Sequence, residues 1–341
     1  MAGVTVDFSE PPNDKERVKL QRRRNRLAAM AGSAAQATSS MRALAAKSQI
    51  AWVYVRSEFV YRNMPAGAPL HGDPSDRRLP DKTDRPPATR IMSPNGAALR
   101  VFLAALFEAQ ARIRPGQHPG NVLPLAAGGD GVTSWIDMLA SGAKSSGTGK
   151  NHMSESAKKI RAMESALDRL AAEELVELTG QGQPGAKKYE KFDLMHEGGR
   201  RANGANVAYH VPVPQQEAAF PVPATLFTNG WIHVLEDTEL TFILMTAALY
   251  HAAGAQPFRV PAGQRLLGFG IGRDAYEAHV MLSRLGLVTV TPDPGRHLDG
   301  KVRDFNSGGH ALPHIIGFTP AGFNRYAVNP LIEQIDYQLS R

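Results

Sequence analysis

The chain has 341 residues, of which 43% are apolar and 21% charged, and this length and composition suit about two domains with buried cores. It contains no cysteine, which excludes disulfides, thiolate nucleophiles and cysteine-based zinc sites and favours a reducing compartment. The formal net charge of +7 favours anionic partners, chiefly nucleic acid.

Neither a membrane segment nor a secretion signal is expected. No apolar run approaches the length of a membrane span. Residues 1–16 include acidic side chains and no apolar core, unlike a signal peptide. We therefore expect a cytoplasmic protein without a membrane partner, in a bacterial cell and associated with the nucleoid or a plasmid.

Residues 1–49 form the first predicted segment, a basic arm that is partly helical and partly disordered. Residues 1–50 hold nine Lys and Arg against four Asp and Glu, a surplus of +5. Residues 15–47 lack proline and predict one or two helices, with a break near Gly32. The run KLQRRRNR, residues 19–26, is interpreted either as a DNA-contacting helix or as a solvated helix face.

Residues 50–95 form the second segment. Residues 50–61, IAWVYVRSEFVY, predict a strand or a short buried helix because aromatic and β-branched side chains dominate. Residues 62–95 are rich in proline and charge, a composition typical of a linker or an extended arm.

Residues 96–196, here called unit one, alternate helical and strand patterns. The stretch ALRVFLAALFEAQARI places apolar side chains on one helical face. A short helix is predicted at 134–139, and a long one near 154–174, where Ile160, Met163, Leu167 and Leu170 follow three- and four-residue steps. Two strands joined by a turn, 174–180 and 189–195, complete the unit.

After a predicted linker at 197–223, residues 224–319 repeat this order and are called unit two. A helix at 235–251, capped by Asp237, precedes a short helix at 261–267 and the turn FGIG. A third helix at 273–285 ends at Gly286. A strand, a turn-rich basic tip and a returning strand near 314–318 follow. Residues 320–341 predict a helical tail.

The stretch MLSRLGLVTVTPDPGR, residues 281–296, resembles the end of the third helix, the strand and the wing of winged helix-turn-helix proteins. Unit one is similar through IRAMESALDRLAAEELVELTG, residues 160–180. The fold class that follows is mainly α with small β-hairpins (α+β), with two winged-helix domains in tandem and a basic N-terminal helical arm. Plasmid replication initiators are the most similar group, followed by winged-helix transcription regulators.

The resemblance implies sequence-specific binding of double-stranded DNA without catalysis and without a cofactor. The third helix packs its apolar stripe on the other two helices and offers its outer face to the major groove, while the hairpin reaches phosphates. Further partners would be a second copy, as a dimer, or replication and transcription proteins. The DNA-contacting residues that follow are Arg22, Arg23 and Arg24 in the arm, Lys150, Asn151, Ser154, Lys158, Lys159, Arg161, Lys187 and Lys188 in unit one, and Arg273, Tyr276, Arg284, Arg296, Lys301 and Arg303 in unit two.

Two other classes remain open. One or both units could dock a protein, since unit two also carries acidic side chains on its third helix. A nicking or processing enzyme could use Tyr326, which lies beside Arg325, or a wing carrying His297, His310 and His314, although no metal ligand set is expected. The loop SSGTGKN lacks the Walker spacing, so we interpret it as a flexible loop.

Overall fold

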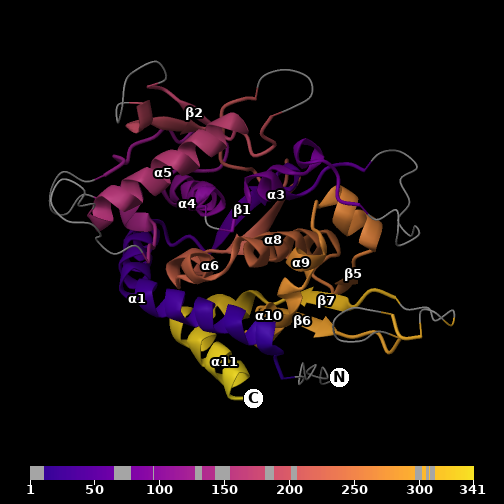
Figure 1. Cartoon of the computed structure of the whole chain (residues 1–341). Helices are drawn as coiled ribbons and strands as arrows, with labels where there is room; N and C mark the ends of the chain where they lie inside the picture. The colour runs from indigo at the N-terminus through magenta and orange to yellow at the C-terminus, as the bar shows by residue number, and fades with distance from the viewer. Residues whose placement is uncertain are drawn as a thin grey trace.

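One continuous helix begins the fold and runs along the outside of the molecule (Figure 1). This helix, α1 (Asp14–Ser48), starts at a capping box in which Asn13 and Glu16 exchange hydrogen bonds between side chain and backbone. The expected break near Gly32 is wrong. A glycine costs a helix about 1 kcal/mol relative to alanine, but the helix continues because side chains on its inner face, such as Met41, are buried.

The protein is described here from a computed structural model. The residues that it describes are 11–64, 78–94, 96–126, 133–142, 154–180, 188–200, 206–295, 302–304, 307 and 312–341. It is mainly helical with small antiparallel sheets, as the sequence predicts.

Unit one contains the predicted helices and strands in the predicted order. They are α4 (Ala98–Arg112), η3 (Trp135–Met138), α5 (Glu155–Ala172), β2 (Val176–Leu178) and β3 (Phe192–Leu194). The short element η3 is a 3-10 helix, and β2 pairs antiparallel with β3. Helix α5 packs on α4 and η3, so the three helices share one interior.

Unit two also follows the predicted order, with one added strand. Its elements are α8 (Asp237–Ala252), β5 (Phe258–Arg259), η6 (Gln264–Gly268), α9 (Arg273–Tyr276), α10 (Ala278–Arg284), β6 (Val288–Thr291) and β7 (Ile315–Phe318). The unpredicted strand β5 pairs with β7, so the sheet order is β5–β7–β6. The predicted cap of α8 is off by one residue, because Glu236 forms a capping box with Glu239.

The third helix of unit two is divided. It forms two short helices, α9 and α10, that meet at Glu277, rather than the single helix predicted. Gly286 ends α10 with a φ of +67°, a left-handed conformation that favours glycine.

The segment predicted as a strand or short buried helix, residues 50–61, pairs with the end of the predicted linker 197–223. Strand β1 (Trp52–Arg56) lies antiparallel to β4 (Ala219–Pro223), with Val53 opposite Val222. The remaining elements are α2 (Ser57–Val60), η2 (Lys82–Asp84), α3 (Pro87–Ile91), α6 (Thr225–Thr228), α7 (Trp231–Val234), η8 (Pro320–Asn324) and α11 (Val328–Ser340). Helix α11 confirms the predicted helical tail.

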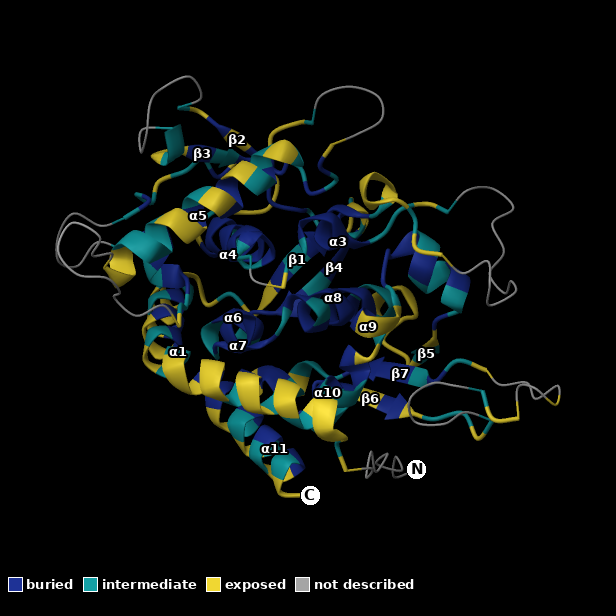
Figure 2. Ribbon diagram, in the orientation of Figure 1, coloured by how far each residue is buried: buried dark blue, intermediate teal, exposed yellow. Residues whose placement is uncertain are grey.

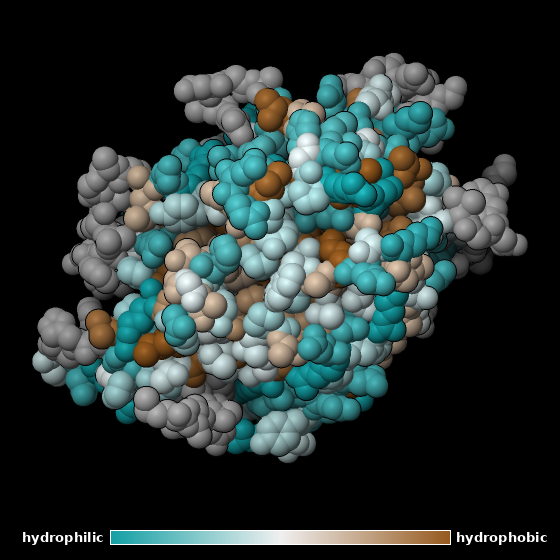
Figure 3. Space-filling view, turned by 180° about the vertical axis from the view of Figure 1, so that it is seen from behind, coloured by the Kyte–Doolittle hydropathy of each residue, from teal (hydrophilic) through white to brown (hydrophobic). Residues whose placement is uncertain are grey.

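A single hydrophobic core joins both units and the elements between them. Phe107 of unit one stacks on Phe227 of α6, with ring centroids 4.8 Å apart. Trp231, which begins the next helix α7, is fully buried. Figure 2 shows buried residues throughout the middle of the molecule. On the face seen from behind, hydrophobic residues form small, separated patches among hydrophilic ones (Figure 3). None of the described helices is long and apolar enough to cross a membrane.

Candidate nucleic-acid interface

The outer face of α5 carries two of the predicted DNA-contacting cations. Met163, Leu167 and Leu170 are buried on the inner face, and Lys158 and Arg161, one turn apart, lie on the other side. Arg161 is exposed and Lys158 half-buried. The sequence-based expectation that these two side chains avoid the apolar stripe is therefore confirmed.

Two neighbouring predicted residues have structural roles instead. Ser154 is the N-cap of α5, and its side chain accepts a hydrogen bond from the backbone of Ala157 at 3.1 Å. Lys159 pairs with Glu155 at 3.4 Å, and its side chain is only 13% exposed. Lys159 is thus turned along the helix rather than outward.

The hairpin of unit one is tied to α5 by an acidic residue. Asp168 accepts hydrogen bonds from Lys188 at 2.7 Å and from the Tyr189 hydroxyl at 2.8 Å. Partial burial by itself would raise the pKa of Asp168. The hydrogen bonds from Lys188 and Tyr189 outweigh this effect and hold the pKa below its ordinary value. The same bond to Asp168 raises the pKa of Lys188. Lys188 therefore fixes the hairpin to α5 and remains about one-third exposed.

The predicted basic arm is fastened to the body. Five of the six arginines of α1 donate hydrogen bonds to other elements, and these five are Arg17, Arg23, Arg24, Arg26 and Arg42. Their partners belong to α11, to the start of α8 and to the end of α6. The basic character of this helix thus serves attachment to acidic side chains and carbonyl groups.

The prediction that Arg23 contacts DNA is wrong, because Arg23 is buried. Its guanidinium donates to both carboxylate oxygens of Glu239, at 2.7 and 2.6 Å, and the two side chains are only 9% and 4% exposed. Arg24 forms a two-pronged pair with Asp336 of α11, so it is also occupied, although both partners are about 40% exposed.

Arg22, one of the predicted DNA-contacting residues of the arm, is exposed as that prediction requires. Lys15 and Lys19 are also exposed, and none of the three forms an ion pair with a residue that the structure describes. Their spacing of four and three residues puts them on one face of α1. Lys19 belongs to the basic run 19–26, which the sequence allowed as either a DNA-contacting helix or a solvated face, whereas Lys15 lies before that run and was not singled out.

In unit two the predicted cations are less available. Arg273 pairs with Glu277 one turn later at 3.3 Å, both exposed. Tyr276 lies between Phe242, whose ring centroid is 5.9 Å away, and the Arg265 guanidinium, 4.7 Å from the tyrosine ring. Tyr276 is thus engaged within the unit.

Arg284, half-buried, and Arg303, exposed, complete the described part of this set. The two arginines of α9 and α10, at 273 and 284, are balanced by Asp274 and Glu277, so the third helix of unit two has no surplus charge. The predicted contacts Lys150, Asn151, Lys187, Arg296 and Lys301 lie outside the described residues.

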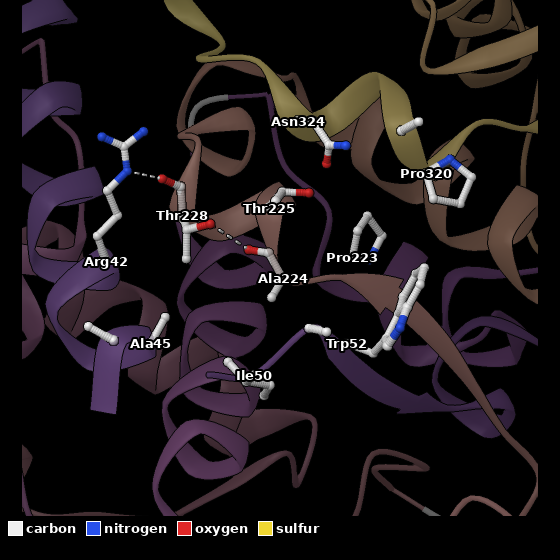
Figure 4. Close-up of a pocket in the computed structure, with 13 residues that line it drawn as sticks. Arg42, Ala45, Ile50, Trp52, Pro223, Ala224, Thr225, Thr228, Pro320 and Asn324 are labelled. Carbon is white, nitrogen blue, oxygen red and sulfur yellow. Dashed lines mark hydrogen bonds between the residues drawn. The ribbon is translucent and has the colours of Figure 1, made fainter. Parts of the chain in front are cut away.

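A groove of about 600 Å³ lies elsewhere, where the end of α1 meets β1, β4 and η8 (Figure 4). Alanine, proline and Ile50 form most of its lining, together with Trp52, which is 40% exposed. Arg42 at its rim donates to the Thr228 carbonyl at 2.6 Å. No acidic or histidine side chain lines this groove, so its described lining offers no acid–base pair.

The residues considered for enzymatic or metal chemistry are spread out. Within the described ranges, no group of three or more His, Asp or Glu side chains could hold a metal ion. His314 is buried, with its ring centroid 5.8 Å from that of His279, whereas His297 and His310 lie outside those ranges. The Arg42 guanidinium lies over the ring of Tyr326, with its central carbon 5.8 Å from the centroid of that ring.

We compared the chain with protein-family models, with curated proteins and with solved structures, and none of these comparisons found a match.

Proposed function

We propose that the chain binds double-stranded DNA sequence-specifically and without catalysis or cofactor, through two winged-helix units. The observation that carries this proposal is the repeated order of helix, short helix, longer or divided helix and antiparallel strand pair. The third helix of unit one packs on α4 and η3, the divided third helix of unit two packs on α8, and each keeps exposed residues on its outer face. A helix presented in this way fits the major groove, and the adjoining hairpin reaches phosphates.

In this proposal α5 is the principal reading helix. Lys158, half-buried, and Arg161, exposed, lie on the side of α5 away from its buried residues, and the hairpin is anchored beside it through Asp168 and Lys188. Arginine reads guanine through a two-pronged hydrogen bond, whereas lysine contributes mainly charge. Lys15, Lys19 and Arg22 on α1 add phosphate contacts.

The test measures binding of the full chain to a fluorescently labelled DNA duplex by fluorescence anisotropy across a salt series. The duplex is about 30 base pairs long, which covers a typical site of two to three helical turns. We expect affinity to fall steeply with salt, by a log–log slope of roughly −0.9 per neutralised phosphate. The variant Lys158→Ala/Arg161→Ala should weaken binding, whereas Lys47→Ala/Arg114→Ala, which removes two exposed cations elsewhere, should not. A wild-type chain that binds no duplex at low salt would refute the proposal.

Replication and transcription would be distinguished by footprinting on DNA that flanks the gene. Repeated sites would favour a plasmid-type replication initiator, and a palindrome in the promoter would favour a regulator that binds as a dimer. Partners among replication or transcription proteins belong to the same proposal, as does a cytoplasmic site of action on a nucleoid or plasmid.

One observation favours a second candidate for unit two, the docking of a protein. The third helix of that unit pairs Arg273 with Glu277 and has no surplus positive charge. If a variant in which both Arg273 and Arg284 are replaced by alanine binds DNA as tightly as the wild type, that helix does not contact DNA, and protein docking becomes the better account.

A further inference from the structure

The segment predicted as a linker packs against the turn that precedes α9. Three glycines of this turn make close approach possible. A Cβ atom added at Gly268 would overlap the ring of Tyr61, one at Gly270 would lie 2.7 Å from the Thr89 hydroxyl, and one at Gly272 would lie 2.8 Å from Leu79. Because no real Cβ tolerates such distances, the segment and the turn are fitted to each other.

Other contacts fix the same junction. The backbone N–H of Arg62 donates to the Gly268 carbonyl at 2.9 Å, and the rings of Tyr61 and Phe269 lie 4.9 Å apart. Gly270 has a φ of +64° and also meets Arg85. Residues 61–64 and 78–91, here called the flanking segment, are thus held against residues 268–272, the turn that leads into α9.

The flanking segment supplies the positive charge that α9 and α10 lack. It contains Arg62, Arg78, Lys82, Arg85 and Arg90 against two aspartates, at 81 and 84. Because Arg90 is paired with Glu173, a surplus of two charges is left on this segment, compared with none on α9 and α10.

Not all of these side chains face solvent. Arg90 is buried and paired with Glu173, and Arg85 donates to the Pro80 carbonyl. Arg78 and Lys82 are exposed, and neither forms an ion pair with a described residue. Arg62 is held by Asp84 at 3.9 Å and donates to the Thr83 carbonyl at 3.1 Å, so Arg78 and Lys82 are the two cations of the flanking segment that can reach a partner.

We propose that Arg78 and Lys82 contact DNA phosphates next to α9 and thereby complete the DNA-binding surface of unit two. This inference depends on the proposed DNA binding. The start of the third helix is the part that enters the groove, so cations held beside that start lie over the flanking sugar–phosphate backbone. Phosphate contacts of this kind fix the register of a protein on DNA without reading bases.

The experiment measures binding of the full-length variant Arg78→Ala/Lys82→Ala to the labelled duplex across the salt series. We expect the dissociation constant to rise roughly tenfold or more at 0.1 M salt, and the magnitude of the salt slope to fall by about 2, because two phosphate contacts are lost. The matched control is Lys47→Ala/Arg114→Ala, which removes the same charge at the end of α1 and after α4.

Failure of this inference is distinguishable from failure of the proposed function. If the wild type binds DNA and the Arg78/Lys82 variant matches it in affinity and slope, the inference is overturned and DNA binding stands. If both double variants lose the same amount, charge alone explains the result, and the inference is again overturned. If the wild type does not bind DNA, the proposed function itself fails. Circular dichroism of each variant verifies that it is folded.

Discussion

Replacing Arg23 with methionine tests whether α1 is part of the folded body or a free DNA-binding arm. Methionine keeps the length and apolar volume of the arginine stem but removes its charge. Glu239 would then be a buried carboxylate without its cation, and among the described residues it would keep the hydrogen bond from the backbone of Glu236 at 2.8 Å. Breaking a buried pair in this way costs about 3–5 kcal/mol, and the remaining hydrogen bond favours the lower end, about 3 kcal/mol.

The free energy of unfolding would be measured by urea titration at pH 7, followed by tryptophan fluorescence, since Trp231 is fully buried. The matched control is Arg24→Ala, which breaks the half-exposed pair with Asp336 and should cost at most about 1 kcal/mol. The double variant Arg23→Met/Glu239→Gln removes the stranded charge and keeps an acceptor for Glu236, so it should recover part of the loss.

Equal losses of unfolding free energy in Arg23→Met and Arg24→Ala would refute the burial of the Arg23–Glu239 pair. That outcome would place Arg23 in solvent, as the sequence-based prediction had it. A second readout is DNA affinity, which a folded Arg23→Met chain should retain because the replaced guanidinium faces the interior.

Three further predictions concern stability. Gly270→Ala should cost more unfolding free energy than Gly286→Ala, because both have left-handed φ but only the Cβ at 270 would meet neighbouring atoms below 3.0 Å; equal losses in urea titrations would contradict this packing. Burial lowers the pKa of His233 to about 3 and that of His279 to about 4, so the unfolded chain takes up protons first and stability falls as pH drops below 6.5. The loss at pH 5 should be about 2 kcal/mol for each histidine, and His233→Leu should flatten the measured pH dependence, whereas an unchanged profile would rule out this origin. Ser154→Ala should lower stability by about 1 kcal/mol through loss of the α5 cap, and Ser156→Ala, two residues later, is the control that should leave it unchanged in the same titration.

Local patterns in the sequence were sufficient for most helices and strands. The spacing of Met163, Leu167 and Leu170 predicted α5 and its buried side. Gly286 marked the end of α10, and the run LVTVT that follows it predicted β6. In each case the determining residues lie within one or two turns of each other, so a single sequence contains the signal.

Contacts between distant segments were not predictable in this way. Strand β1 pairs with β4 across a separation of more than 150 residues, and no local feature indicates that partner. The run containing Arg23 has the composition of an exposed basic helix, and only the position of Glu239 on α8 turns one of its arginines inward. The candidate site was affected most, because exposure of a cation depends on such long-range pairs.

The structure also changes what the net charge of +7 means for DNA binding. Much of the surplus on α1 is matched by Glu239, Asp336 and Glu236, so that charge attaches the helix and is not presented to a ligand. The same attachments, together with the β1–β4 pair and the shared core, hold α5 and α9 in one body instead of on a flexible tether. If both helices read DNA as proposed, their fixed separation allows them to engage one duplex only at matching spacings of the half-sites. The distance between the two recognised DNA sequences would therefore be set by the packing of α1 and β1 within the protein. Contacts between side chains and bases would not determine that distance.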